Sequence, residues 1–418
     1  SFASSHAREK TRGIVYLPTT SYIEMNEWTL PAERSHDLHK LIEAETAAGR
    51  FEAHKPFLRG GIWRNFMSRY PEANWMHKRM LGASQRLAML APAQRSAAMQ
   101  EYLHRAQAND AYWHGLFGGL YLPHLRRAVW NNLLALEAAL TALVPAAACE
   151  QFDLDHDGHL ELTLRGGDLQ AFVRDDGDAA LVEFSSFKLT HNFGDTLRAY
   201  PEAYHAKIDQ THTAHLADGG IASAHDRVAF LQPIQAQDAA PDERPRGMFL
   251  ERLSDAEGIS HPLANYAPDS QQGRWIAHFE EYSVEKTYRL GAEGLSVDFR
   301  VVGRGLPAVI ETELNLALPS CDGYGGRYVL ADGSIPGGFG QEQAFENMRK
   351  ITLEDNELGG ALIVSSAQPI RFKATPHRTV SQSEAGFEKI MQAVCIKLAW
   401  TPLLGTEQSI LLKVVAAS

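Results

Sequence analysis

The sequence predicts an α+β multidomain protein, with an N-terminal helical domain followed by a large antiparallel β-sandwich. Two observations lead to this prediction. Up to about residue 143 apolar residues recur three or four positions apart, whereas after residues 145–148 they alternate with polar ones. A chain of 418 residues is also long enough for two or three domains. We therefore expect a linker over residues 1–31, a helical domain over 32–148 and the sandwich over 149–418.

Four helices are expected in the first part of the chain. Pro31 suits the first position of a helix, where its missing N–H has no partner to lose, and Gly49 suits the stop after the last turn. In the longest helix, apolar residues from Leu125 to Leu143 form one stripe. The expected helices span residues 32–48, 72–90, 93–107 and 123–143.

Strands are expected throughout the second part. Leu160, Leu162 and Leu164 alternate with polar residues, which is typical of a strand with one buried face. Because the strands follow one another without intervening helices, an antiparallel sandwich is favoured. The glycine-rich residues 323–340 are expected to form a mobile loop. The other expected strands span residues 169–174, 180–184, 227–231, 247–253, 275–290, 295–301, 307–317, 360–364, 389–400 and 409–416.

Charge and cysteine content exclude several classes of protein. The chain has 40 Lys and Arg against 51 Asp and Glu, a net charge of −11, so a general nucleic-acid binder is not expected. Apolar runs fall short of the roughly 18 residues that cross a bilayer, so no membrane partner is expected. The widely spaced Cys149, Cys321 and Cys395 form neither a disulfide framework nor a CxxC motif. A cytoplasmic protein is the simplest interpretation.

The densest group of chemically active residues lies between two expected helices, at residues 109–119. An acid, a tryptophan and a histidine, at Asp110, Trp113 and His114, stand within five positions. Sugar sites use this mixture, because the ring faces of a pyranose stack on aromatic side chains while its hydroxyls need polar partners. The alternative is that Trp113 and Phe117 are core residues and Asp110 caps a helix. The local chemistry leaves both interpretations open.

Four stretches resemble one known enzyme family. They are residues 109–127 (NDAYWHGLFGGLYLPHLRR), 12–31 (RGIVYLPTTSYIEMNEWTLP), 57–80 (FLRGGIWRNFMSRYPEANWMHKRM) and 130–133 (WNNL). Together, and in this order, they resemble glycoside hydrolase family 57, especially its 4-α-glucanotransferases and α-amylases. The resemblance implies a helical domain that completes a glucan cleft, and a C-terminal sandwich.

The resemblance also implies what this chain does and what it lacks. Such enzymes cleave and re-form α-1,4-glucan bonds of starch or maltodextrin with retention, using a Glu nucleophile and an Asp acid/base. In the family, both lie on an N-terminal barrel that precedes the region of Arg12. We therefore expect residues 1–31 to include the end of that barrel-like region, and no catalytic residue to lie in this chain. Retention needs two carboxyl groups about 5 Å apart, so the chain alone is expected to be inactive.

The resemblance further implies binding residues and partners. Asp110, Trp113 and Trp28 are expected to contact an α-1,4-glucan or maltooligosaccharide, with His114 as a weaker candidate. The expected protein partner is the N-terminal catalytic barrel of the same protein. Members of the family often form dimers, so a homodimer is a further expectation.

A second motif has the composition of a calcium loop. Asp153, Asp155 and Asp157 alternate before Gly158, and a hard cation such as Ca²⁺ prefers six to eight oxygen ligands. The closing Glu of an EF-hand is absent, because Leu164 occupies its place. An acidic turn that only caps the sandwich is the alternative. No organic cofactor is expected.

Two other functions remain open on the sequence. The chain could be a self-contained carbohydrate enzyme or sugar-binding protein that uses a mutarotase-like β-sandwich, in which case a sandwich carboxylate would carry activity on free sugars. Alternatively, the β domain could serve only in assembly and contact no sugar.

Overall fold

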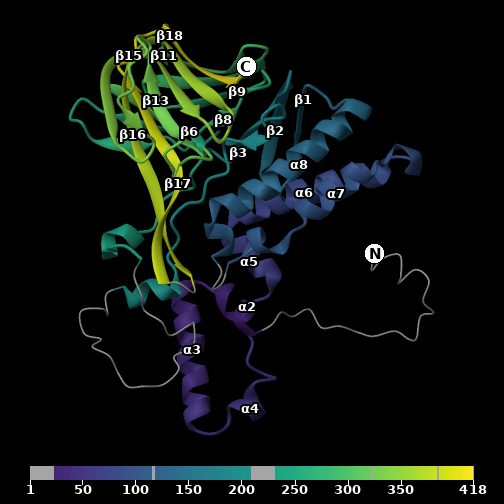
Figure 1. Cartoon of the computed structure of the whole chain (residues 1–418). Helices are drawn as coiled ribbons and strands as arrows, with labels where there is room; N and C mark the ends of the chain where they lie inside the picture. Colours follow the sequence, from purple (N-terminus) through teal and green to yellow (C-terminus); the bar gives the residue numbers. More distant parts are fainter. Residues whose placement is uncertain (1–22, 115–117, 209–230, 322, 384–385, 418) are drawn as a thin grey trace. The chain divides into compact units, whose positions relative to one another are not determined.

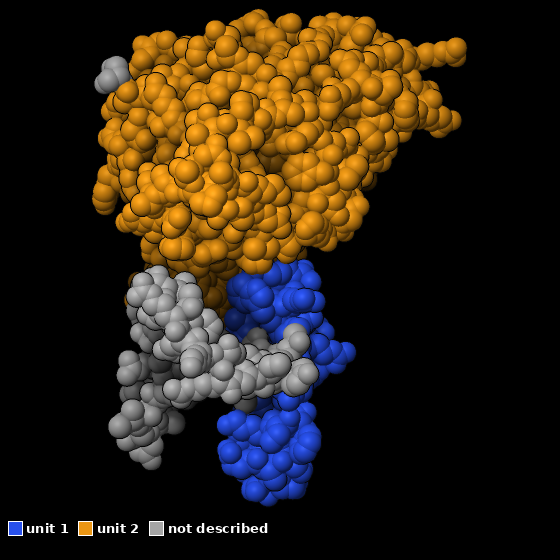
Figure 2. All heavy atoms as spheres, turned by 90° about the vertical axis from the view of Figure 1, so that its right-hand side faces the viewer, with its two compact units in different colours: residues 1–69 blue, residues 70–418 orange. Residues whose placement is uncertain are grey.

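The computed structural model describes residues 23–114, 118–208, 231–321, 323–383 and 386–417. The chain forms two compact units, residues 1–69 and residues 70–418 (Figure 2). The expected helical domain of residues 32–148 is therefore divided between the two units.

The first unit is helical in its described part. Arg69 fastens the chain between the first two helices, because its Nη1 donates hydrogen bonds to the backbone oxygens of Trp28 (2.9 Å) and Leu30 (2.5 Å). The helix expected at 32–48 is confirmed, with Pro31 before it and Gly49, at φ +68°, after it. The helices are α2 (Ile23–Trp28), α3 (Ala32–Ala47), α4 (Phe51–His54) and α5 (Trp63–Arg69).

The second unit begins with a layer of three longer helices. The helices expected at 72–90 and 123–143 are confirmed as α6 (Pro71–Met89) and α8 (Pro123–Leu143). The helix expected at 93–107 begins later, as α7 (Ala97–Ala106), because the Ser96 side chain accepts a hydrogen bond from the Met99 N–H and caps it. Short 3₁₀ helices are η1 (Pro92–Gln94), η2 (Asn109–Tyr112), η3 (Gly119–Tyr121), η4 (Ala203–Lys207) and η6 (Ala236–Ala239).

Within the described residues, eighteen antiparallel strands form one continuous sheet that folds back on itself (Figure 1). The side chains that face inward make one large apolar core, as the alternation in the sequence predicted. The strands are β1 (Cys149–Phe152), β2 (Leu160–Gly166), β3 (Leu169–Asp175), β4 (Leu181–Ser186), β5 (His191–Asn192), β6 (Met248–Ser254), β7 (Ser260–Pro262), β8 (Ala267–Pro268), β9 (Arg274–His278), β10 (Tyr282–Gly291), β11 (Gly294–Gly303), β12 (Val309–Leu316), β13 (Gly326–Leu330), β14 (Gly337–Gly338), β15 (Gln343–Asp355), β16 (Gly360–Ser383), β17 (Gly386–Trp400) and β18 (Glu407–Ala416).

Several strand predictions need correction. The strand expected at 360–364 continues through β16 to Ser383, with a register shift against β17 between His377 and Arg378. The glycine-rich segment expected as a loop contains β13 and β14, which pair with each other. Gly326 is required there, because a Cβ at this position would lie 2.1 Å from the Phe339 ring. Most of the strand expected at 227–231 lies outside the described residues.

A buried ionic network joins the helices of the second unit to its sheet. Arg79 of α6 donates to both carboxylate oxygens of Glu137 of α8, at 2.6 and 2.5 Å. The same guanidinium donates to Glu183 of β4, at 2.8 and 3.1 Å, and Trp75 Nε1 donates to Glu183 at 2.9 Å. All three charged side chains are buried. This network is why the helices from α6 onward belong to the same compact unit as the strands.

The described helices also bear on membrane contact. None of them, within the parts of the chain described above, is both long enough and apolar enough to cross a membrane.

Replacing Arg79 tests the network. We expect Arg79→Met to lower the free energy of unfolding by about 3–5 kcal/mol, because Glu137 and Glu183 stay buried without their cation. Urea unfolding followed by circular dichroism measures this change. Arg105→Met is the matched control, since Arg105 makes an exposed ion pair with Glu101, and its cost should stay below about 1 kcal/mol. Equal effects of the two substitutions would contradict the assignment.

Candidate functional site

The loop that carries Asp110, Trp113 and His114 is closed by its own backbone. The Leu120 N–H donates to the Trp113 carbonyl at 2.8 Å. Gly119 adopts φ +51°, and a Cβ there would lie 2.0 Å from the Trp113 oxygen and 2.9 Å from the Asp110 oxygen. Only glycine fits this approach. The turn therefore holds the backbone of the expected sugar-contact residues in one conformation.

A buried hydrogen-bond network lies directly beneath this loop. The hydroxyls of Tyr70 and Tyr121 both donate to Glu202 Oε1, each at 2.6 Å. The Tyr70 oxygen also lies 2.7 Å from His114 Nε2. Because the Tyr70 proton is directed to Glu202, His114 must donate from Nε2. Burial, together with the Glu202 charge, raises the pKa of Tyr121 well above its usual value.

The structure places the expected sugar-contact residues in different surroundings. Asp110 is exposed at the start of η2, and Trp113 is half-buried. His114 is buried, with its ring edge-on to those of Tyr70 and Tyr121. Trp28 is half-buried at the end of α2, in the other unit. Contact of these four residues with a glucan stays a prediction, and Asp110 and Trp113 are the ones with accessible surface on one loop.

The acidic loop lies between β1 and β2 and is organised by its own carboxylates. Asp153 accepts hydrogen bonds from the backbone N–H groups of Asp157 and Gly158, both at 3.2 Å. Asp157 accepts from the His159 N–H at 2.9 Å. Gly158 adopts φ +95°, as the sharp turn requires.

The carboxylates that converge here differ in part from the expected set. Oxygens of Asp153, Asp155 and Glu161 lie within 4.8 Å of one another, so Glu161 joins two of the three expected ligands. Asp157 lies beside this group, 3.6 Å from the Arg174 that pairs with Asp155. The sequence analysis missed Glu161 because it placed this residue on the polar, outward face of β2. In the structure both faces of β2 are covered, and Glu161 is 0% exposed.

The acidic loop carries more negative charge than its neighbours neutralise. Arg174 donates to Asp155 Oδ2 at 2.5 Å, but its Nε is 3.6 Å from Glu161 Oε1, which has no hydrogen-bond partner among the described residues. Burial raises the pKa of Glu161 to about 7, against a lowering effect of the Leu154 N–H bond. Burial also raises the pKa of Asp155. A cation would stabilise the ionised form of both groups.

Comparison with known proteins identifies the family. Residues 61–140 match the family described as "Alpha-amylase/4-alpha-glucanotransferase, middle domain", and residues 153–411 match "Alpha-amylase/4-alpha-glucanotransferase, C-terminal". The chain belongs to the α-amylase/4-α-glucanotransferase family, and it contains the middle and C-terminal domains of that family. The resemblance found in the sequence is confirmed.

Individual relatives agree with this assignment. The chain is 32% identical over 401 residues to an α-amylase of Pyrococcus furiosus, which covers 92% of this chain and 56% of the relative. It is 31% identical over 399 residues to a 4-α-glucanotransferase of Thermococcus litoralis, covering 92% and 57%. The crystal structure of a T. litoralis 4-α-glucanotransferase superimposes with a TM-score of 0.75 at 27% identity, covering 99% of this chain and 60% of that one. The chain thus spans little more than half the length of these relatives.

The tyrosine–glutamate network gives a test of the loop. We expect Tyr121→Phe to lower the free energy of unfolding by about 1–3 kcal/mol, because buried Glu202 loses one of its donors. Hydrogen exchange at the Leu120 amide, which closes the loop, should become faster. Tyr324→Phe is the matched control, because Tyr324 is fully exposed. Unchanged exchange at Leu120 in the Tyr121 variant would show that the network does not hold the loop.

Proposed function

We propose that this chain is the C-terminal portion of a retaining α-1,4-glucan-processing enzyme, and that its loop at residues 109–114 contributes binding contacts to the glucan. The observation that carries the proposal is the consecutive match to the middle and C-terminal domains of an α-amylase/4-α-glucanotransferase family. The natural substrate in this proposal is starch, maltodextrin or a maltooligosaccharide.

The geometry of the loop supports this role. Asp110 offers an exposed carboxylate that accepts hydrogen bonds from sugar hydroxyls, and Trp113, three residues further on, offers part of an indole surface. The backbone between them is held by Gly119 and by the buried network of Tyr70 and Glu202. A binding group fixed in this way loses little conformational entropy when the ligand arrives.

Catalysis is assigned to a part of the enzyme that precedes these domains. Glycosidic bond cleavage with retention needs a nucleophile and an acid/base about 5 Å apart on opposite sides of the bond. We propose that an N-terminal barrel of the same protein supplies both groups, and that the chain described here supplies binding and support. The wide spacing of the three cysteines supports a cytoplasmic enzyme. We further propose that the complete enzyme assembles as a homodimer.

The proposal is tested by binding and turnover on one sample. With maltoheptaose, we expect calorimetric binding to the chain without new products by chromatography, because the proposal places both catalytic carboxylates in the barrel. Asp110→Ala and Trp113→Ala should each weaken binding about tenfold. The first removes a charge-assisted hydrogen bond to the sugar, and the second removes a stacking contact.

Asp37→Ala is the control for this experiment, since Asp37 is an exposed carboxylate of α3. Its binding should equal that of the unaltered chain. Turnover by the chain would overturn the assignment of catalysis to the barrel and favour the self-contained sandwich enzyme. If neither loop substitution changes the affinity for maltoheptaose, the proposal that the loop contacts the glucan is wrong.

We also propose that the acidic loop binds Ca²⁺, with Asp153, Asp155 and Glu161 as ligands and Asp157 beside them. The supporting observation is the buried Glu161 Oε1, which has no hydrogen-bond partner within the described part of the chain although it lies among other carboxylates. Hard cations prefer such oxygens. A bound cation would fasten β1 to β2 beside the helix layer, where Asn74 of α6 donates to the Asp155 carbonyl at 2.8 Å.

Calcium binding should depend on pH in a defined direction. The folded-state pKa of Glu161, about 7, lies above its ordinary value of 4.5. Between these values the folded chain holds a proton that the unfolded chain has released, so stability without Ca²⁺ falls as pH rises through this window. Ca²⁺ has to displace the same proton, so its affinity should rise up to about pH 7 and then level off.

Calorimetric titration with Ca²⁺ at pH 5.5 and pH 8 measures the pH dependence of the affinity for Ca²⁺. We expect heat and a rise in melting temperature at pH 8, both reversed by EGTA, and at least tenfold weaker binding at pH 5.5. Glu161→Gln should abolish the response, whereas Glu354→Gln, on an exposed ion pair with Arg327, should preserve it. Absence of heat at pH 8 would contradict Ca²⁺ binding and favour the alternative, an acidic turn that only caps the sandwich.

A further inference from the structure

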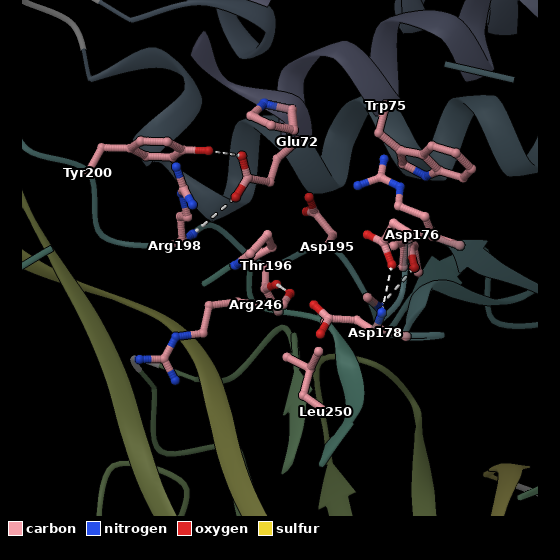
Figure 3. A pocket seen from close by; sticks show the side chains of 18 of the residues that line it. Glu72, Trp75, Asp176, Asp178, Asp195, Thr196, Arg198, Tyr200, Arg246 and Leu250 are labelled. Atoms are coloured by element: carbon pink, nitrogen blue, oxygen red, sulfur yellow. Dashed lines mark hydrogen bonds between the residues drawn. The ribbon is translucent and has the colours of Figure 1, made fainter. Parts of the chain in front are cut away.

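A pocket lined by charged and aromatic side chains lies within the second unit, between the helix layer and the sheet (Figure 3). Its cavity volume is about 70 Å³, less than half of the roughly 150 Å³ that hold one benzene. One edge of a sugar ring with its hydroxyls therefore fits inside, and the rest of the ring would lie at the open side of the pocket. The walls come from α6, α8, the turn after β3, the segment after β5, and β6. No residue of the 109–114 loop lines it.

Two hydrogen-bond donors of residues that line this pocket have no acceptor among the described residues. They are Asn192 Nδ2 and Arg198 Nε, and both are buried. The Nε of a third lining residue, Arg174, faces Glu161 Oε1 at 3.6 Å. The orientation of Asn192 is fixed, because its Oδ1 accepts from the N–H groups of Phe184 and Gly194. Asn192 is also 1% exposed. Buried donors without partners are costly, so their concentration on one wall indicates a ligand with acceptor oxygens.

The carboxylates of the same wall exclude an anion as that ligand. Glu72, Asp176, Asp178 and Asp195 face the pocket with three arginines. The arginines are also engaged behind the wall: Arg174 pairs with Asp155, and Arg246 pairs with Asp242. No positive charge is left in excess for an anion. A cation is disfavoured as well, because it cannot accept hydrogen bonds from Asn192 Nδ2 and Arg198 Nε.

A neutral polyol can pair with both the hydrogen-bond donors and the carboxylates that line this pocket. A hydroxyl group accepts from Asn192 or Arg198 through its oxygen and donates its proton to a carboxylate such as Asp178. Trp75, Trp130 and Tyr200 supply apolar surface to the same pocket, and the ring of Tyr200 stacks under the Arg198 guanidinium at 4.5 Å. Aromatic walls beside hydroxyl-binding groups suit the two faces of a pyranose.

We propose that this pocket binds a single pyranose unit, either a free hexose or the terminal residue of a maltooligosaccharide, apart from the contacts of the 109–114 loop. The choice of glucose as that pyranose rests on the proposed function, whereas the preference for a neutral hydroxylic ligand rests on the pocket alone. The cavity takes one edge of a ring, so the rest of that ring and any longer chain would have to extend toward solvent.

Two substitutions in the pocket test the proposal by isothermal titration of the whole chain with glucose and with maltose. Arg198→Met keeps the length of the side chain and removes its donors, and Asp178→Asn keeps the shape and removes the charge. We expect millimolar affinity for the unaltered chain and at least about tenfold weaker binding in both variants. Arg327→Met, on the exposed surface of β13, is the control and should bind as the unaltered chain does. Circular dichroism and melting temperature establish that each variant is folded.

The outcomes separate this site from the loop site. Binding lost in the pocket variants and retained in Asp110→Ala supports the pocket. Binding lost in Asp110→Ala and retained in both pocket variants overturns the pocket and leaves the loop function intact. Heat with inorganic phosphate but none with either sugar overturns the neutral-ligand assignment. Absence of heat with glucose, maltose and phosphate at 50 mM also overturns the pocket, and the maltoheptaose titration then decides the loop function by itself.

Discussion

The arrangement of the second unit depends on one buried cation. Arg79 reaches from α6 to a carboxylate on α8 and to another on β4, so two helices and a strand meet at a single guanidinium. Two buried carboxylates would repel each other strongly without it. The planar fork of arginine can bind both at once, which a lysine could not do with the same geometry. The position of the helix layer on the sheet follows from this contact.

Covering the sheet with helices has a chemical consequence. A sandwich usually leaves the outer face of each strand in water, where polar side chains cost nothing. Here the outer face under α6 and α8 is buried, and it is polar: Glu161, Thr163 and Glu183 are all 0% exposed. Such groups need partners, and Glu183 finds Arg79, Trp75 and Ser185. Glu161 Oε1 and Asn192 Nδ2 find none among the described residues and lie where we propose ligands, whereas Thr163 Oγ1 also finds none there and lines neither site.

The helix layer on the sheet also explains which features could be predicted from the sequence and which could not. Local patterns were sufficient for the helix at 123–143 and for two of the converging acids, Asp153 and Asp155, because period and spacing are properties of neighbouring residues. They failed for Glu161, since alternation assigned it to solvent, whereas Arg174 of β3 and the backbone of Leu154 lie against its carboxylate. The pocket of Asn192 and Arg198 was beyond such reasoning, because its walls come from segments more than a hundred residues apart. No short motif marks a site of that kind.

Arg174 links the two proposed ligand sites. Its Nη2 donates to Asp155 in the acidic loop, while the side chain also lines the pocket. Three carboxylates of the loop region, Asp155, Asp157 and Glu161, lie against this one guanidinium. A cation at the loop would take over part of that charge compensation. Because coupling between two sites is reciprocal, a pocket ligand that contacts Arg174 would change the affinity of the loop for the cation by the same factor as the cation changes the affinity of the pocket.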